Sequence, residues 1–126
     1  MDMQAEQDHS PLTLFYSYAD EDEKLCKELE KHLTLLQRQA VIVGWQRHKI
    51  LSGEDKNEIN AQQFSSAQII LLLISPDFLA SDVSHSEMER AMLRHRAGLA
   101  SVIPLLLRPV DYELASFASL QVLFLN

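Results

Sequence analysis

Acidic and hydroxyl side chains follow two apolar runs of this sequence. Ser17 and Tyr18 come directly after the run at 12–16 (LTLFY), and Glu87 lies beyond the run at 68–74 (QIILLLI). A carboxylate held in a site from which water is excluded can stabilise positive charge that develops during a reaction. Glu87 also falls in the first turn of a predicted helix, where the helix dipole favours any acid by about 0.3–1 kcal/mol. The residues alone therefore leave two interpretations of Glu87 open, a catalytic carboxylate and an ordinary solvated acid.

Several kinds of chemistry lack the residues they need. The chain has no glycine-rich dinucleotide-binding fingerprint and no P-loop. Its single cysteine, Cys26, excludes an internal disulfide and a cysteine-based zinc site. His85 and Glu89 are four residues apart on a predicted helix, but the sequence supplies no third ligand for a metal. We therefore expect no metal site and no resident cofactor.

Charge and hydropathy narrow the range of partners. The 126 residues carry 11 basic and 18 acidic side chains, a net charge of −7, which disfavours nucleic acid and anionic membrane surfaces. The longest apolar run, at 69–74, is far shorter than the ~20 residues of a membrane span. Residues 1–10 have neither the basic cluster nor the apolar stretch of a signal peptide. We expect a cytoplasmic protein with no nucleic-acid partner and no membrane partner.

The apolar pattern predicts strands that alternate with helices. Strands are predicted at 12–16, 40–43, 68–74, 102–107 and 122–125, and helices at 20–36, 54–66 and 84–95. Asp20 and Glu23 form a capping box that would begin the first helix. Pro76 is placed to open a short turn after the third strand. Pro104, inside the fourth strand, indicates an edge position or a bulge.

This alternation is typical of an α/β fold with a flavodoxin-like, doubly wound parallel sheet in the strand order 2-1-3-4-5. We expect a single domain at 11–126 after a disordered polar lead at 1–10. A closing helix would be expected after the fifth strand, so either that helix is lost or the chain is part of a longer protein. Ligands of such sheets bind at the carboxyl ends of the strands, near the switch point between strands 1 and 3. Residues 17–20, 46–53 and 75–86 would line that crevice.

Five segments resemble, in order and at family spacing, the TIR (Toll/interleukin-1 receptor) domain of bacterial proteins. They are LFYSYADED (14–22), GWQRHKILSGED (44–55), IILLLISPDFLASDVSHSEMERAM (69–92), VIPLLLRPVDY (102–112) and ASLQVLFLN (118–126). The resemblance implies one of two functions. The first is an NAD⁺ glycohydrolase that releases nicotinamide and ADP-ribose or a cyclic isomer, activated by self-association, with NAD⁺ as substrate and no cofactor. The second is a non-catalytic scaffold that makes homotypic TIR–TIR contacts in signalling.

Counted from Ser75-Pro76, the residue that matches the catalytic glutamate of the family's enzymes is Glu87. Nicotinamide leaves the ribose as a neutral molecule and needs no protonation, so one carboxylate can suffice where most glycoside hydrolases need two. Val83 and Ser84 stand where several of these enzymes carry Trp or Cys, so this part of the pocket wall departs from the pattern.

The resemblance also implies substrate contacts outside that helix. Ser17 and Tyr18 match the strand end that contacts the nucleotide, although Tyr18 could equally only cover the edge of the sheet. Gly53 matches the glycine of the long loop after the second strand, which in TIR domains borders the NAD pocket and mediates self-association.

A response-regulator receiver has the same kind of sheet and is an alternative. Asp20, Asp22 and Asp77 mimic its acidic pair and its phosphorylated aspartate. The last predicted strand, however, offers no lysine where that class requires one.

Overall fold

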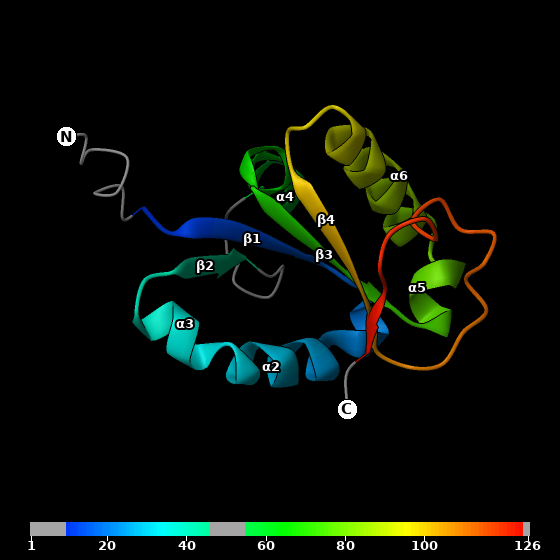
Figure 1. Ribbon diagram of the computed structural model, residues 1–126, viewed down its shortest axis with the longest axis horizontal. Coiled ribbons are helices and arrows are strands. Elements are labelled where there is room, and N and C mark those ends of the chain that lie inside the picture. Colours follow the sequence, from blue (N-terminus) through cyan, green and yellow to red (C-terminus); the bar gives the residue numbers. More distant parts are fainter. Residues whose placement is uncertain (1–9, 46–54, 125–126) are drawn as a thin grey trace.

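The computed structural model describes residues 10–45 and 55–124, so residues 1–9 of the predicted lead at 1–10, the loop at 46–54 and residues 125–126 lie outside the described residues. Five parallel strands form one sheet in the order β2-β1-β3-β4-β5, which confirms the predicted fold class and strand order (Figure 1). The strands are β1 (Leu12–Ser17), β2 (Ile42–Trp45), β3 (Ile69–Ile74), β4 (Ser101–Leu106) and β5 (Leu123–Phe124). The helices are η1 (Asp20–Asp22), α2 (Glu23–His32), α3 (Thr34–Arg38), α4 (Lys56–Ser66), α5 (Pro76–Ala80) and α6 (Asp82–Arg96).

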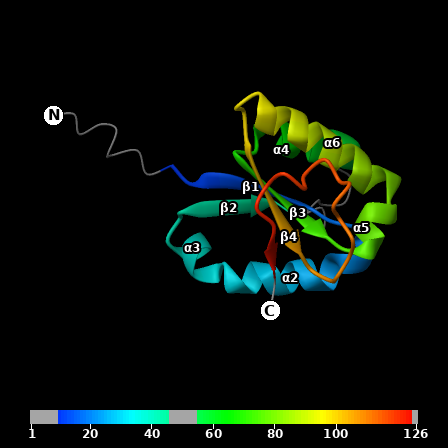
Figure 2. The ribbon, with the colours of Figure 1, turned by 45° about the vertical axis from the view of Figure 1, so that its right-hand side comes forward.

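Helices cover both faces of the sheet. α2 and α3 lie on one face, and α4, α5 and α6 lie on the other (Figure 2). Because successive side chains of a strand point to opposite faces, β1 and the residues after it divide between two cores. Phe15 and Ala19 pack with Phe64 and Met88 on the face covered by α4 and α6. Leu14, Tyr16 and Tyr18 pack under α2 on the other face.

The predicted helix at 20–36 is wrong in its details, because the chain there forms three separate helices. Asp20 to Asp22 make a single 3-10 turn, and α2 begins only at Glu23. The capping box is also wrong: Asp22 is the N-cap residue of α2, and its side chain makes no capping hydrogen bond. Leu33 then separates α2 from α3, where its N–H is shared between the carbonyls of Leu29 and Glu30. The carboxylate of Asp22 is used for a tertiary contact described below.

Three side-chain caps start the helices of the opposite face. In each of them the side chain of the N-cap residue accepts a hydrogen bond from the N–H three residues further along. The pairs are Asp55 and Glu58 in α4, Ser75 and Phe78 in α5, and Ser81 and Ser84 in α6. The predicted turn at Pro76 is therefore a short helix with Pro76 in its first turn, where a missing N–H costs nothing. α6 begins at Asp82, two residues before the predicted start, because Ser81 supplies the cap.

Pro104 lies in β4, which stands between β3 and β5 in the sheet order. β5 pairs only with Leu105 and Leu106, so within the described residues the side of β4 that faces β5 is unpaired at Pro104. The expectation of an edge position therefore holds locally, although β4 as a whole is an inner strand. Among the described helices, none is both long and apolar enough to cross a membrane; the predicted cytoplasmic location stays a prediction.

Gly44 in β2 provides a test of packing between the edge strand and its neighbour. A Cβ atom added at Gly44 would lie 2.7 Å from Cε1 of Tyr16. Tyr16 is fully buried and burial raises the pKa of its phenol, so this ring is a fixed part of a dense interior. We expect Gly44→Ala to lower the free energy of unfolding by about 1–3 kcal/mol in a urea titration, because an overpacked site forces neighbours to shift.

The exposed neighbour Val43 in the same strand provides the control. Val43→Ala changes only strand propensity and should cost at most about 1 kcal/mol. Equal stability of Gly44→Ala and the wild type would contradict the close approach of Tyr16 to β2.

Candidate active site

Glu87 is almost completely buried, with 2% of its surface exposed. Both of its carboxylate oxygens accept hydrogen bonds. The Ser17 hydroxyl donates to Oε1 over 2.7 Å, and the Asn60 amide Nδ2 donates to Oε2 over 3.1 Å. The interpretation of Glu87 as an ordinary solvated acid is therefore wrong. Because α6 begins at Asp82, Glu87 also lies beyond the first turn, where the favourable effect of the helix dipole has largely decayed.

Three elements bring these side chains together from distant parts of the chain. Ser17 is the last residue of β1, Asn60 lies in α4, and Glu87 lies in α6. The sheet order places β1 beside β3, so the helices that follow β2 and β3 cover its carboxyl end. The site therefore forms near the switch point between strands 1 and 3, where open α/β sheets bind ligands.

The other predicted site residues that the structure describes differ in burial and in position relative to Glu87 and Ser17. Ser84 is buried one turn before Glu87, and its N–H donates to the Ser81 hydroxyl. Val83 is 66% exposed. Tyr18 is buried in the cluster under α2, on the opposite face of the sheet from Ser17, and Gly53 lies outside the described residues. Of the predicted set, Ser17 and Glu87 are joined by a hydrogen bond between their side chains.

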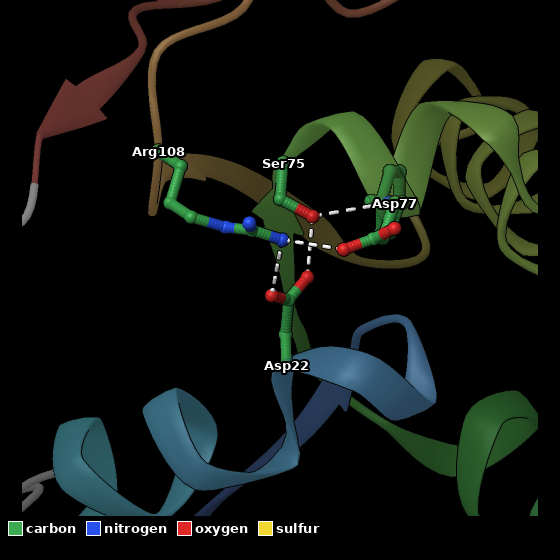
Figure 3. Close-up of polar contacts among 5 residues, drawn as sticks. Asp22, Ser75, Asp77 and Arg108 are labelled. Carbon is green, nitrogen blue, oxygen red and sulfur yellow. Dashed lines mark hydrogen bonds and ion pairs between the residues drawn. The ribbon is translucent and has the colours of Figure 1, made fainter.

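A second polar cluster ties the same end of β1 to the ends of β3 and β4 (Figure 3). Asp22 is buried, and its Oδ2 accepts a hydrogen bond from the Ser75 hydroxyl. The guanidinium Nη2 of Arg108 donates to Oδ1 of Asp22 over 2.9 Å and to Oδ2 of Asp77 over 2.6 Å. Hydrogen bonding to Asp77, together with the charge of Asp22, raises the pKa of Arg108. Arg108 therefore stays positive and bridges two carboxylates.

Asp22 and Asp77, two of the three aspartates that mimic a receiver domain, are both engaged in this second cluster. The residue directly after β3 is Ser75, and Asp77 lies in α5. The Arg108 guanidinium contacts both carboxylates. The described residues also hold no group of three or more His, Cys, Asp or Glu side chains that could bind a metal.

Sequence reasoning missed Asn60 and Arg108. One signal was available for Arg108, because a polar residue follows each of three parallel strands: Ser17 ends β1, Ser75 follows β3 and Arg108 follows β4. The carboxyl ends of parallel strands meet at one edge, so these residues had to be neighbours. Asn60 had no comparable signal, since it sits in mid-helix among other polar residues.

A cavity of about 280 Å³ lies beside α6. Leu79, His85, Met88, Asp111, Leu114 and Ala115 line it. Glu87 is not among them, because its side chain is held by β1 and α4. The mostly apolar cavity and the buried carboxylate are thus separate features of α6.

Comparison with known proteins identifies the family signature. The model of the TIR domain family matches residues 14–126. The sequence is 45% identical over 109 residues to y4lF, an uncharacterized protein of Sinorhizobium fredii (strain NBRC 101917 / NGR234), with 86% of this chain and 34% of that protein covered. The chain thus spans about a third of the length of this curated relative.

The fold also matches a solved TIR domain. The TIR domain of the Toll-related receptor TRR-2 from Hydra magnipapillata is similar in structure with a TM-score of 0.66, over 88% of this chain and 82% of that one, at 18% sequence identity. At this identity the similarity concerns the fold alone. The family match gives no support to the receiver alternative.

The buried carboxylate of Asp22 should be important for stability. In Asp22→Asn one of the two oxygens that receive hydrogen bonds becomes an NH₂ group that faces a donor. We expect the free energy of unfolding to fall by about 1–3 kcal/mol, the usual cost of an unsatisfied buried polar group, as measured by urea denaturation.

Two further variants calibrate that measurement. Glu21→Gln removes an exposed carboxylate from the same turn and should stay within about 0.5 kcal/mol of the wild type. Asp77→Asn, at a half-exposed partner of Arg108, should fall between the two. If Asp22→Asn unfolds at the wild-type urea concentration, the cluster does not support the fold.

Proposed function

Because the chain belongs to the TIR domain family, we propose that it is an NAD⁺ glycohydrolase. It cleaves the bond between nicotinamide and ribose and releases nicotinamide together with ADP-ribose or a cyclic isomer. Some members of the family are enzymes of this kind and others are scaffolds, so the family alone leaves the choice open. The observation that carries the proposal is the burial of Glu87, with both oxygens hydrogen-bonded, at the carboxyl end of β1.

The chemistry requires one well-placed negative charge. Cleavage leaves positive charge on the ribose while the pyridinium departs as neutral nicotinamide, so no general acid is needed for the leaving group. A carboxylate in a site from which water is excluded stabilises that charge far more than one in bulk water. In this proposal Glu87 exchanges the Ser17 hydroxyl for a ribose hydroxyl. Water, or another part of the substrate, then captures the sugar.

The remaining substrate contacts rest on the resemblance and on position. Ser17 is the best supported, because its hydroxyl already occupies Oε1 of Glu87. Ser84 lies on the same side of α6, one turn earlier, and is buried. Val83 is exposed, and Tyr18 packs on the opposite face of the sheet. With Gly53, they stay predictions as substrate contacts.

The second candidate function is a non-catalytic TIR scaffold. Exposed apolar side chains on both outer strands favour it. Val43 of β2 and Leu123 and Phe124 of β5 are exposed, and β2 and β5 are the outer strands of the described sheet. Unpaired strand edges with exposed apolar side chains are sites where a second chain can add. The same contacts would serve the enzyme, because we propose that self-association completes its pocket.

The proposed function is tested by following NAD⁺ and its products by mass spectrometry, with the protein at high concentration so that it can assemble. We expect the wild type to release nicotinamide. Glu87→Gln should lower kcat at least about 100-fold, because loss of one group that stabilises transition-state charge costs about 10²–10³.

Glu89→Gln is the matched control, since it makes the same substitution two residues further along α6. Glu89 is half-exposed, and the nearest approach of its carboxylate to His85 is 4.0 Å. This variant should keep wild-type activity. NAD⁺ left intact by concentrated wild-type protein would favour the scaffold, and full activity of Glu87→Gln would remove Glu87 from the mechanism.

A further inference from the structure

Helices α4 and α6 meet along one stripe of residues on each helix, which we call the α4–α6 seam. On α6 the stripe consists of Glu87, Arg90 and Arg94, and on α4 it consists of Asn60, Phe64 and the C-cap residue Ala67. Within each stripe the spacing is three or four residues, which places the members on one helix face. The polar groups of the seam are therefore arranged as pairs along the two helices, and Glu87 with Asn60 is the first pair.

The other contacts of the seam fix α4 against α6. The guanidinium of Arg90 lies over the Phe64 ring, 4.9 Å from the ring centroid. Arg94 Nη1 donates to the carbonyl of Phe64 over 2.8 Å and to that of Ala67 over 3.0 Å. The last carbonyls of a helix lack their usual partner one turn further along. Arg94 donates to two acceptors at the end of α4, and one of them, the Phe64 carbonyl, also accepts from the N–H of Ala67.

We propose that Asn60 is a positioning residue for Glu87, and that Arg94 keeps Asn60 in place by holding the end of α4. This inference rests on the proposed function of Glu87. It adds to that function a residue that neither the sequence pattern nor the resemblance assigned. Asn60 touches the reacting carboxylate and not the substrate, so it acts through Glu87.

The orientation of the Asn60 amide is set by this contact. Its Nδ2 donates to Glu87, while its Oδ1 is buried and accepts no hydrogen bond from the described part of the chain. Turning the amide over would place Oδ1 against a carboxylate oxygen, and two acceptors repel each other. The carboxylate therefore fixes the amide, and the amide in turn fixes Oε2 of Glu87.

Fixing Oε2 matters for the proposed reaction because Oε1 has to change partners. When a ribose hydroxyl replaces Ser17 at Oε1, the Asn60 bond still holds the carboxylate plane. Without this bond the glutamate side chain could move and would accelerate the reaction less, since displacement of a catalytic group by about 1 Å can lower the rate about 10²-fold. Asn60 thus keeps the carboxylate aimed during the step in which its other contact is exchanged.

The test compares kcat and KM for NAD⁺ in variants of Asn60, with matching variants of Asn57 as controls. Asn57 lies one turn earlier in α4 and is exposed. We expect Asn60→Ala to lower kcat by about 10- to 100-fold, with KM within about threefold, because the aim of the carboxylate is lost and substrate binding is not. Asn57→Ala should match the wild type in both constants.

Asn60→Asp separates positioning from packing. Aspartate has nearly the shape of asparagine, so a packing role predicts a milder effect than that of Asn60→Ala. A positioning role predicts the reverse order at alkaline pH, where both carboxylates are ionised, because the second carboxylate would face Oε2 at a hydrogen-bond distance and repel it. At lower pH the pair can share a proton, which restores a hydrogen bond. At alkaline pH we expect kcat of Asn60→Asp to fall below that of Asn60→Ala, and Asn57→Asp to leave kcat unchanged.

The role of Arg94 is tested by combining substitutions. Arg94→Leu should lower kcat about 10-fold, and the double variant with Asn60→Ala should be no slower than Asn60→Ala alone, because both changes act through one contact. Arg96→Leu, at an exposed arginine of the same helix, is the control. Arg94→Lys keeps the charge and one donor near these carbonyls, and provides an intermediate variant if Arg94→Leu does not fold.

The outcomes distinguish this inference from the proposed function. If the wild type cleaves NAD⁺, Glu87→Gln does not, and Asn60→Ala keeps wild-type kcat, then the positioning role is overturned and the function stands. A rise in KM with unchanged kcat for Asn60→Ala would also overturn it, since that pattern indicates substrate binding. A wild type that leaves NAD⁺ intact overturns both.

Discussion

The requirement that a buried carboxylate be hydrogen-bonded governs the carboxyl end of this sheet. Removing an ionised carboxylate from water costs several kcal/mol unless donors replace the lost water. Glu87 meets this requirement with a hydroxyl from β1 and an amide from α4. The strand, the two helices and their relative placement are therefore linked through one side chain. Loss of either donor would remove one of these hydrogen bonds from a carboxylate in the interior.

The segment between β1 and α2 is anchored at both of its ends. At its start Ser17 is bound to α6, and at its end Asp22 is bound to Ser75 and Arg108 beyond β3 and β4. The six residues from Ser17 to Asp22 thus connect elements on both sides of the switch point. Asp22 takes part in this cluster in place of capping α2, so the position of the loop depends on tertiary contacts more than on local helix propensity.

The sequence predicted the fold well and the site only in part, for physical reasons. Apolar runs such as Ile69–Ile74 and helix periodicity are local properties, and they placed the strands within about two residues. The strand order followed from their alternation and from the right-handed crossovers of such sheets. The start of α2 was wrong because the partners of Asp22 lie at positions 75 and 108, which no local pattern reveals. Glu87 was identified by resemblance, whereas Asn60 and Arg108 depend on which helices and strands the fold sets side by side.

The parallel direction of α4 and α6 gives Arg94 a further electrostatic effect. Both helices run antiparallel to the strands, so their C-termini lie at the same end of the molecule. Each C-terminus carries the negative end of a helix dipole, and the two negative ends repel each other. Arg94 contacts carbonyls of Phe64 and Ala67 at the end of α4, and its Nη2 donates to Leu99 just beyond the end of α6. The Arg94 charge thus lies near the carboxyl ends of both helices, where a cation is favourable, and the far end of α6 helps to hold together the layer that carries Glu87.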